Sequence, residues 1–182
     1  MQDCYISRDF PRFVAAIIAR ISDPQLRHAI VANLWEEHGE GNFDRAHSRL
    51  FDLLLESIGI EPSNLDAPSP ATKDFINMQI ELTDGDLLAG LGAFCYGNEY
   101  LTLSEFRPIE RACLRVFPES NPAYFVANRQ ADGKHARDAE RVIVALCSGK
   151  DDIDQVKRGA EAAVDARLSF YDELCKNLGT VS

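Results

Sequence analysis

Hydrophobic positions recur at three- and four-residue steps along almost the whole chain, which is the period of an amphipathic helix. The first such stripe consists of Phe10, Phe13, Val14, Ile17, Ile18 and Ile21. Strand-like alternation is nearly absent from the sequence, and no internal repeat is visible. The pattern predicts about six or seven helices, several of them longer than about 20 residues, and hence an all-α helical bundle with an interior site.

Proline, glycine and capping residues indicate where the helices end. The Ser-Asp-Pro segment at 22–24 closes the first helix and caps the second, with the proline near its first turn. The second helix meets an irregularity at Gly39 and Gly41, after which helical spacing resumes from Ala46 to about Ile58. The clearest loop is 59–70, which is rich in Pro, Gly, Ser, Asn and Asp.

The second half of the chain predicts longer helices. A short helix around 75–82 and a turn at 83–85 precede a long helix at about 86–116, in which Pro108 could cause a break. Another helix covers 124–146. Three glycines in the long helix would let another helix approach closely: Gly90, Gly92 and Gly97. The last helix carries an apolar stripe of Val156, Ala160, Ala163, Val164, Leu168, Tyr171 and Leu174.

Composition narrows the class of protein. A length of 182 residues suits a single domain spanning residues 1–182, and 46% hydrophobic content is ordinary for a soluble protein. A formal net charge of −10 argues against nucleic acid or an anionic membrane as a partner. The apolar runs are too short to cross a bilayer, and the first residues do not resemble a secretory signal. Five cysteines without a CxxC spacing indicate reduced thiols, so we expect a cytoplasmic protein.

Three segments place candidate metal ligands on helices. Segment 33–51 offers Glu36, Glu37, His38, Glu40, Asp44 and His47. In segment 124–146, Asn128, Asp132 and His135 are spaced i, i+4 and i+7, so they share one helix face. Acid and imidazole on a buried face are costly unless they share a metal ion or a hydrogen-bond network. In segment 90–106, Glu99 stands alone among apolar and aromatic residues, as an acid that points inward to a cation would.

Each segment also has a simpler interpretation. The acid-rich stretch around Glu37 could be a solvated helix end, and the face of Asn128 and His135 could be solvated beside Lys134. His28 and His38 are interpreted as surface or supporting residues rather than ligands. The cysteines are interpreted as small apolar core residues.

In chain order, the three segments resemble the heme-oxygenase-like diiron oxidases, which are relatives of the thiaminase II and pyrroloquinoline-quinone synthase families. The pattern reads Glu37, then His47, then Glu99, then Asn128-x3-Asp132-x2-His135. The stretch EEHGEGNFDRAHSRLF carries the most specific part of the resemblance, which covers roughly residues 20–178.

The resemblance implies a bundle of about seven helices, often dimeric, that holds two iron ions and activates O2. Carried over, Glu37 and Glu99 would be bridging or terminal carboxylates, His47 would bind one iron, and Asp132 with His135 would bind the other side of the cluster. No catalytic residue beyond these ligands is assigned. We therefore expect a non-heme iron oxidase or oxygenase that acts on a small organic molecule with O2, as a homodimer.

Two departures from the family pattern qualify this expectation. Asn128 stands where the family usually has histidine, so one metal position should be weak or empty, leaving one or two iron ions. Glu40, seven residues before His47, fits a straight helix better than Glu37 does, but the flanking glycines indicate that the helix is not straight there, so Glu40 is kept as the alternative first ligand. The alternative function keeps the fold without a metal, either as a thiaminase-II-like hydrolase using Cys95 and Glu99 or as a non-catalytic binding protein.

Overall fold

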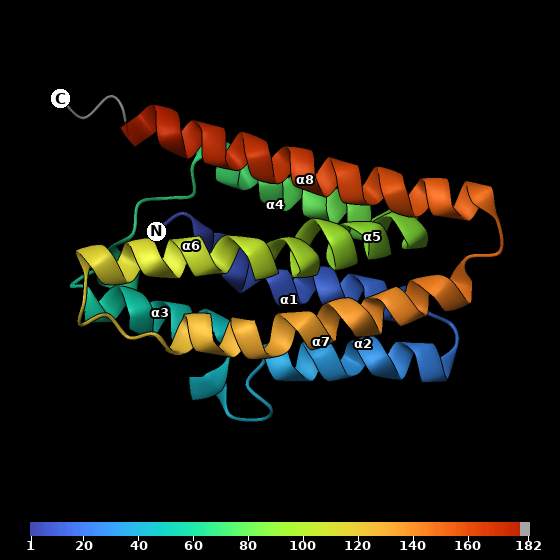
Figure 1. The fold of residues 1–182 in the computed structure, drawn as a ribbon, viewed down its shortest axis with the longest axis horizontal. Coiled ribbons are helices and arrows are strands. Elements are labelled where there is room, and N and C mark those ends of the chain that lie inside the picture. The colour runs from blue at the N-terminus through green and yellow to red at the C-terminus, as the bar shows by residue number, and fades with distance from the viewer. Residues whose placement is uncertain (179–182) are drawn as a thin grey trace.

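The protein is a bundle of long helices lying roughly along one common direction (Figure 1). A computed structural model describes the backbone of residues 1–178 and the side chains of these residues except at 132, 177 and 178. No strand occurs in this described part. The α-helices are α1 (Asp3–Arg20), α2 (Pro24–Glu37), α3 (His47–Ser57), α4 (Pro70–Asp84), α5 (Leu87–Phe94), α6 (Tyr100–Val116), α7 (Ala123–Leu146) and α8 (Lys150–Leu178).

Three short turns complete the chain path: the 3-10 turns η1 (Phe43–Arg45) and η2 (Pro62–Asn64) and the π-helical turn η3 (Cys95–Glu99). Because η3 joins α5 directly to α6, residues 87–116 form one continuous rod, and the described helices amount to seven rods. The predicted all-α bundle of six or seven helices is confirmed.

The long central helix is irregular at a different place from the one expected. Pro108 lies inside α6 and does not end it, so the expected break there is wrong. Pro108 and Ser104, one turn earlier, are both exposed, so water can bind the carbonyl that proline leaves without a donor. The real irregularity is η3, where the backbone N–H of Tyr100 reaches back five residues to the carbonyl of Cys95.

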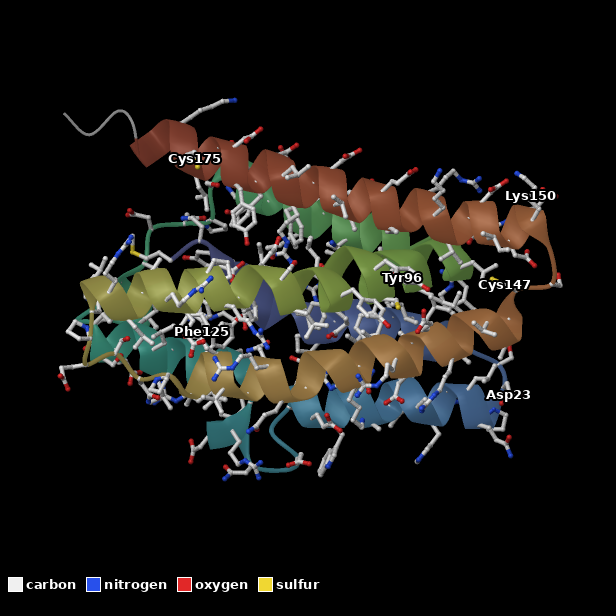
Figure 2. All side chains as sticks on the ribbon, in the orientation of Figure 1. Asp23, Tyr96, Phe125, Cys147, Lys150 and Cys175 are labelled. Carbon is white, nitrogen blue, oxygen red and sulfur yellow. The ribbon has the colours of Figure 1, made fainter. Side chains whose placement is uncertain are left out.

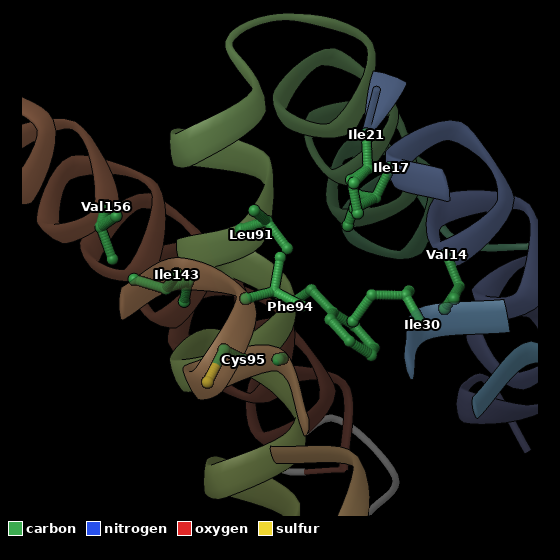
Figure 3. Close-up of a cluster of buried hydrophobic side chains, with 11 residues drawn as sticks. Val14, Ile17, Ile21, Ile30, Leu91, Phe94, Cys95, Ile143 and Val156 are labelled. Atoms are coloured by element: carbon green, nitrogen blue, oxygen red, sulfur yellow. The ribbon is translucent and has the colours of Figure 1, made fainter. Parts of the chain in front are cut away.

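The central core lies where α1, α2, α5, α7 and α8 meet. Figure 3 shows Ile17, Leu91, Phe94 and Val156 converging there, and all of them are buried. The apolar stripe predicted for 10–21 faces this core. None of the described helices is long and apolar enough to cross a membrane.

Two exposed residues correct the predicted stripes. Leu168 is 58% exposed, because the buried face of α8 runs through Val156, Ala163, Arg167 and Phe170 instead. Trp35, which continues the hydrophobic spacing of Leu26, Ile30 and Leu34 in the second predicted helix, is 56% exposed. The buried stripe of α8 therefore contains a charged residue, Arg167, that the predicted apolar stripe did not include.

The cysteines are all free, as expected for reduced thiols. Cys147 directly follows α7, Cys175 lies near the C-terminal end of α8 (Figure 2), and Cys95 is a member of the central core (Figure 3). No described pair of cysteines is joined, so no disulfide contributes to the described fold.

The helices α5 and α8 cross so closely that only glycine fits at two positions. A Cβ atom added to Gly92 would lie 2.0 Å from the Val156 carbonyl oxygen, and one added to Gly159 would lie 1.9 Å from that of Ala89. The predicted close approach at Gly92 and at Gly97 is confirmed, since a Cβ on Gly97 would lie 2.4 Å from Ala163 Cβ. This crossing fixes α8 against the rod that carries Glu99.

We predict that Gly92→Ala destabilises the protein although alanine is the better helix former. Forcing α5 and α8 apart should lower the free energy of unfolding by about 1–3 kcal/mol, as overpacking of a core does. Gly149→Ala is the control, because no atom lies within 4 Å of its added Cβ, and it should change stability by less than about 0.5 kcal/mol. Equal urea midpoints for the two variants would contradict the close crossing.

Candidate metal centre

The first candidate ligand, Glu37, is the last residue of α2. That helix begins at Pro24, where the side chain of Asp23 accepts hydrogen bonds from the backbone N–H groups of Gln25 and Leu26. Glu37 is buried, with 5% of its surface exposed. The helix therefore delivers a carboxylate to the interior at the point where the chain must turn.

The backbone of the turn after α2 shows which of Glu37 and Glu40 faces the interior. Residues 39–41 all have positive φ angles, of 75°, 55° and 88°, and Glu40 is the only non-glycine residue with a positive φ in the described chain. Glu40 is exposed and pairs with Arg45 at 3.1 Å, away from the interior. The geometry therefore favours Glu37 over Glu40 as the first-helix ligand.

His47 is brought back to Glu37 by the same turn. It is the first residue of α3 and is buried, and its Nδ1 lies 3.0 Å from Glu37 Oε2. Gly39 permits this return, because a Cβ there would collide with the backbone of Asn42 and Ala46. The pair of Glu37 and His47 expected from the sequence thus meets in space.

Glu99 is directed inward by the π-helical turn. In η3 an additional residue is accommodated in one helical turn, so that Cys95, Gly97, Asn98 and Glu99 are all buried. Only 3% of Glu99 is exposed. The lone acid in an apolar run is therefore an interior acid, as predicted.

The third candidate segment lies on α7. His135 is fully buried and Asn128 is 8% exposed, so this face is not solvated. The amide of Asn128 donates a hydrogen bond from Nδ2 to the carbonyl of Tyr124 at 2.7 Å. Asp132 is part of α7 between them, but its side chain lies outside the described residues, and its role stays a prediction.

Three donor atoms, one each from Glu37, Glu99 and His135, converge in the interior within 4.8 Å of one another. The Nδ1 atom of His135 is 3.6 Å from Glu37 Oε1 and 3.5 Å from Glu99 Oε1. His47 joins this group through Glu37. Four of the five predicted ligands are thus held close together by α2, α3, η3 and α7.

Glu36 supports His135 from the other side of the ring, a role that the sequence pattern did not reveal. His135 Nε2 lies 3.0 Å from Glu36 Oε2, and Lys134 Nζ lies 2.9 Å from Glu36 Oε1. A carboxylate that accepts from Nε2 leaves the lone pair on Nδ1 free to bind a metal ion. The only sequence signal for this arrangement was the pair of adjacent glutamates in the EEHGE stretch. Glu37 is a candidate ligand, and Glu36 contacts the ring of His135.

Burial and neighbouring charges shift the pKa values of His135 and Glu99 in opposite directions. Burial acts to lower the pKa of His135, but the carboxylates of Glu99, Glu37 and Glu36 outweigh it and raise the pKa to about 9. Burial raises the pKa of Glu99, and its interaction with His135 opposes that shift only in part. The buried acids therefore require a positive charge among them, which a proton or a metal cation can supply.

The residues present fit an iron ion. Glu99 Oε1 and His135 Nδ1 are buried and have no hydrogen-bond partner among the described residues, although both are directed at the same space. Imidazole and carboxylate together are a ligand set typical of non-heme iron, with positions left open for O2. Unsatisfied ligand atoms that converge in a buried space are what a metal site presents.

A small cavity of about 40 Å³ adjoins the ligands, room for roughly three water-sized groups. Glu37, His47, Glu99 and Asn128 line one part of it. Cys95 is not among the lining residues.

The thiaminase-II-like alternative depended on Cys95 as a nucleophile. Its thiol donates to the carbonyl of Ala136 at 3.3 Å, and burial raises the pKa of that thiol to about 12. A thiol in this state is not a nucleophile near neutral pH. The geometry therefore disfavours that alternative.

Fold and site together define a helical bundle with an interior centre for a metal ion bound by carboxylates and histidines. A family model described as "Iron-containing redox enzyme" matches residues 1–168. The chain belongs to this family of iron-containing redox enzymes, and iron is the cofactor that the family uses. The expected class, an iron-dependent redox enzyme of the heme-oxygenase-like type, is confirmed.

Two related proteins come from species of Chlamydia. The chain is 31% identical over 178 residues to a 4-aminobenzoate synthase of Chlamydia trachomatis, covering 94% of this chain and 74% of the relative. It is 29% identical to a 4-aminobenzoate synthase of Chlamydia muridarum, covering 94% of this chain and 73% of that protein.

Solved structures share the fold. A CADD-like protein of unknown function from Nostoc punctiforme superposes with a TM-score of 0.82 at 20% identity, covering 97% of this chain and 79% of that one. A domain of unknown function with a heme oxygenase-like fold from Shewanella denitrificans gives 0.77 at 18% identity, covering 98% and 76%. The predicted heme-oxygenase-like architecture is confirmed.

We predict that Glu36→Gln weakens iron binding by at least about tenfold, because the neutral amide no longer raises the basicity of His135. The measurement is anaerobic titration with Fe(II) against a competing chelator. Glu81→Gln, which changes an exposed glutamate on α4, is the control and should bind iron as the wild type does. Unchanged affinity in Glu36→Gln would mean that Glu36 does not act through His135.

The raised pKa of His135 gives the metal-free protein a defined pH dependence. A group whose folded-state pKa is raised contributes stability that is present below its ordinary value of 6.5 and is lost as the pH rises through about 9. The melting temperature of the metal-free protein should therefore decrease as the pH is raised from about 6.5 to about 9. His135→Gln should remove most of this dependence, and His28→Gln, at an exposed position, should not.

Proposed function

We propose that this chain is an oxidase or oxygenase that uses iron bound by Glu37, His47, Glu99, Asp132 and His135 to oxidise a small organic molecule with O2. The observation that carries the proposal is the convergence of buried ligand atoms of Glu99 and His135 beside Glu37, neither of which has a hydrogen-bond partner among the described residues. Iron bound there supplies open coordination positions and electrons for the activation of O2.

The chain's own residues contribute position and exclusion of water. Glu36 holds the His135 ring so that Nδ1 is directed at the ligand space. The burial of Glu37 and Glu99 keeps bulk water away, which strengthens every electrostatic interaction at the centre. The rods α5–α6 and α7 keep the ligands in place, because η3 packs against α7 and α8.

Asn128 bears on how many iron ions bind. An amide is a poorer iron ligand than imidazole, and here its Nδ2 already donates to a backbone carbonyl. We infer one tight iron position formed by Glu37, Glu99 and His135, and a second, weaker one toward Asn128. The relatives named 4-aminobenzoate synthase make an aromatic amine of that type the first product to test for. A cytoplasmic homodimer remains the expected setting.

The proposal predicts iron binding that depends on His135 and is increased by restoring the missing histidine. After anaerobic loading with Fe(II) and gel filtration, the wild type should retain about one iron per chain, and Asn128→His about two. His135→Ala should lose most of the iron, whereas His28→Ala on the exposed face of α2 should not. Iron is measured by elemental analysis, and O2 uptake by an electrode after exposure to air.

Two results would contradict the proposal. Wild-type iron content no higher than that of His135→Ala would mean that these residues do not form the site. Iron binding without any O2 uptake in the presence of a reductant would leave a metal-binding protein rather than an oxidase.

A further inference from the structure

Arg167 is a buried cation on α8 that lines the same cavity as the candidate iron ligands. It is 4% exposed, and the cavity also contains Glu37 and Glu99 in its lining. Burying a guanidinium is costly unless its N–H groups are paired. Whether Arg167 serves only the fold therefore depends on what its donors contact.

The donors of Arg167 are incompletely used. The guanidinium has five N–H donors. Nη2 donates to Asn98 Oδ1 at 3.2 Å, and the group lies 4.7 Å from the centre of the Phe75 ring. Nε has no hydrogen-bond partner among the described residues. Nη1 lies 3.6 Å from Asp3 Oδ1, too far for a hydrogen bond, and that oxygen is also buried without a partner.

Two acids face this cation, and neither pairs with it closely. Asp3, in the first turn of α1, keeps 28% of its side chain exposed. Burial raises the pKa of Glu105, although Arg167 and the hydroxyl of Tyr171 oppose that shift. A carboxyl group with a raised pKa compensates a neighbouring positive charge less completely.

The rest of the cavity indicates what could approach the cation. Ile6, Phe10 and Phe106 give it apolar walls, and Ser7 adds a hydroxyl group. A space for roughly three water-sized groups suits a carboxylate head group and the atoms next to it. The cavity thus has a cationic part, apolar walls and the candidate iron ligands.

We propose that Arg167 anchors the substrate by binding its carboxylate, so that the substrates of this enzyme are small organic acids with an apolar body. The inference rests on the proposed function, because it names the substrate class of that site. The planar fork of arginine matches the two oxygens of a carboxylate. Fixing the carboxylate at Arg167 would hold the apolar part of the acid beside Glu37 and Glu99, as positioning for reaction requires.

The first test compares acids with their amides in the unaltered protein. Isothermal titration calorimetry with butyrate and benzoate, against butyramide and benzamide, is carried out on iron-free and iron-loaded protein. We expect at least one acid to bind about tenfold more tightly than its amide in both forms. Equal binding of acid and amide, or binding of neither, would overturn the proposal.

Variants then locate the binding group. Arg167→Met keeps most of the side-chain length without the charge and should abolish the preference for the acid, whereas Arg167→Lys should retain part of it. Arg158→Met, at an exposed position on the same helix, is the matched control. A preference that survives Arg167→Met would place the carboxylate on the iron or elsewhere, and would overturn the proposal.

Asp3→Asn provides a test that does not require removal of the buried cation. If an acid binds at Arg167, removing the adjacent negative charge should tighten that binding severalfold. If Arg167 serves only to hold α1 through Asp3, the variant should lower the melting temperature without changing acid binding, and the proposal fails.

Iron content separates this inference from the proposed function. Normal iron loading without a preference for acids would overturn the anchor alone. An acid preference that depends on Arg167 in a protein that binds no iron would overturn the proposed function and leave the anchor in place.

Discussion

Two carboxylates and an imidazole share a space from which bulk water is largely excluded, and their charges must be balanced from within the protein. Glu37 and Glu99 are held there by helix ends and turns that a plain bundle would not need. The raised pKa of His135 reflects the same requirement, since the acids retain a proton on the ring when no metal ion is present. A cation is therefore part of the stable state of this interior rather than an addition to it.

The candidate ligands come from separate helices, so they converge only when the bundle is assembled. The α2 end, the α3 start, η3 and α7 each contribute one or more groups, and the glycine-mediated crossing of α5 and α8 keeps the central rod in place. Metal binding in such a site is coupled to folding, because the unfolded chain cannot offer the same donors together. Stability and cofactor content should consequently change together.

The sequence revealed the parts of this arrangement that depend on periodicity. Three- and four-residue spacing was sufficient for the all-α bundle, and the i, i+4, i+7 spacing of Asn128, Asp132 and His135 was sufficient to define a face. It could not decide between Glu37 and Glu40, because a turn of three positive φ angles separates them and leaves no periodic signal.

The supporting role of Glu36 and the burial of Arg167 were missed for a different reason. Both are charged residues whose role depends on partners that are distant in the sequence, His135 and Asn98 respectively. Arg167 does fit the helical spacing of the buried face of α8, since it lies four residues after Ala163 and three before Phe170. A charged residue at such a position is nevertheless ordinarily predicted to be at the surface.

The π-helical turn has a consequence for how this protein could evolve or be engineered. Deleting one residue from Cys95–Glu99 would restore regular α-helical geometry, and regular helices are usually the more stable. Because the π turn absorbs the additional residue, the same deletion would leave both sides of the rod facing as they do now and would change only which of residues 95–99 point inward. Selection for thermal stability alone would therefore favour a chain that folds better and no longer directs Glu99 at the candidate metal site, so that stability and chemistry compete at a single residue.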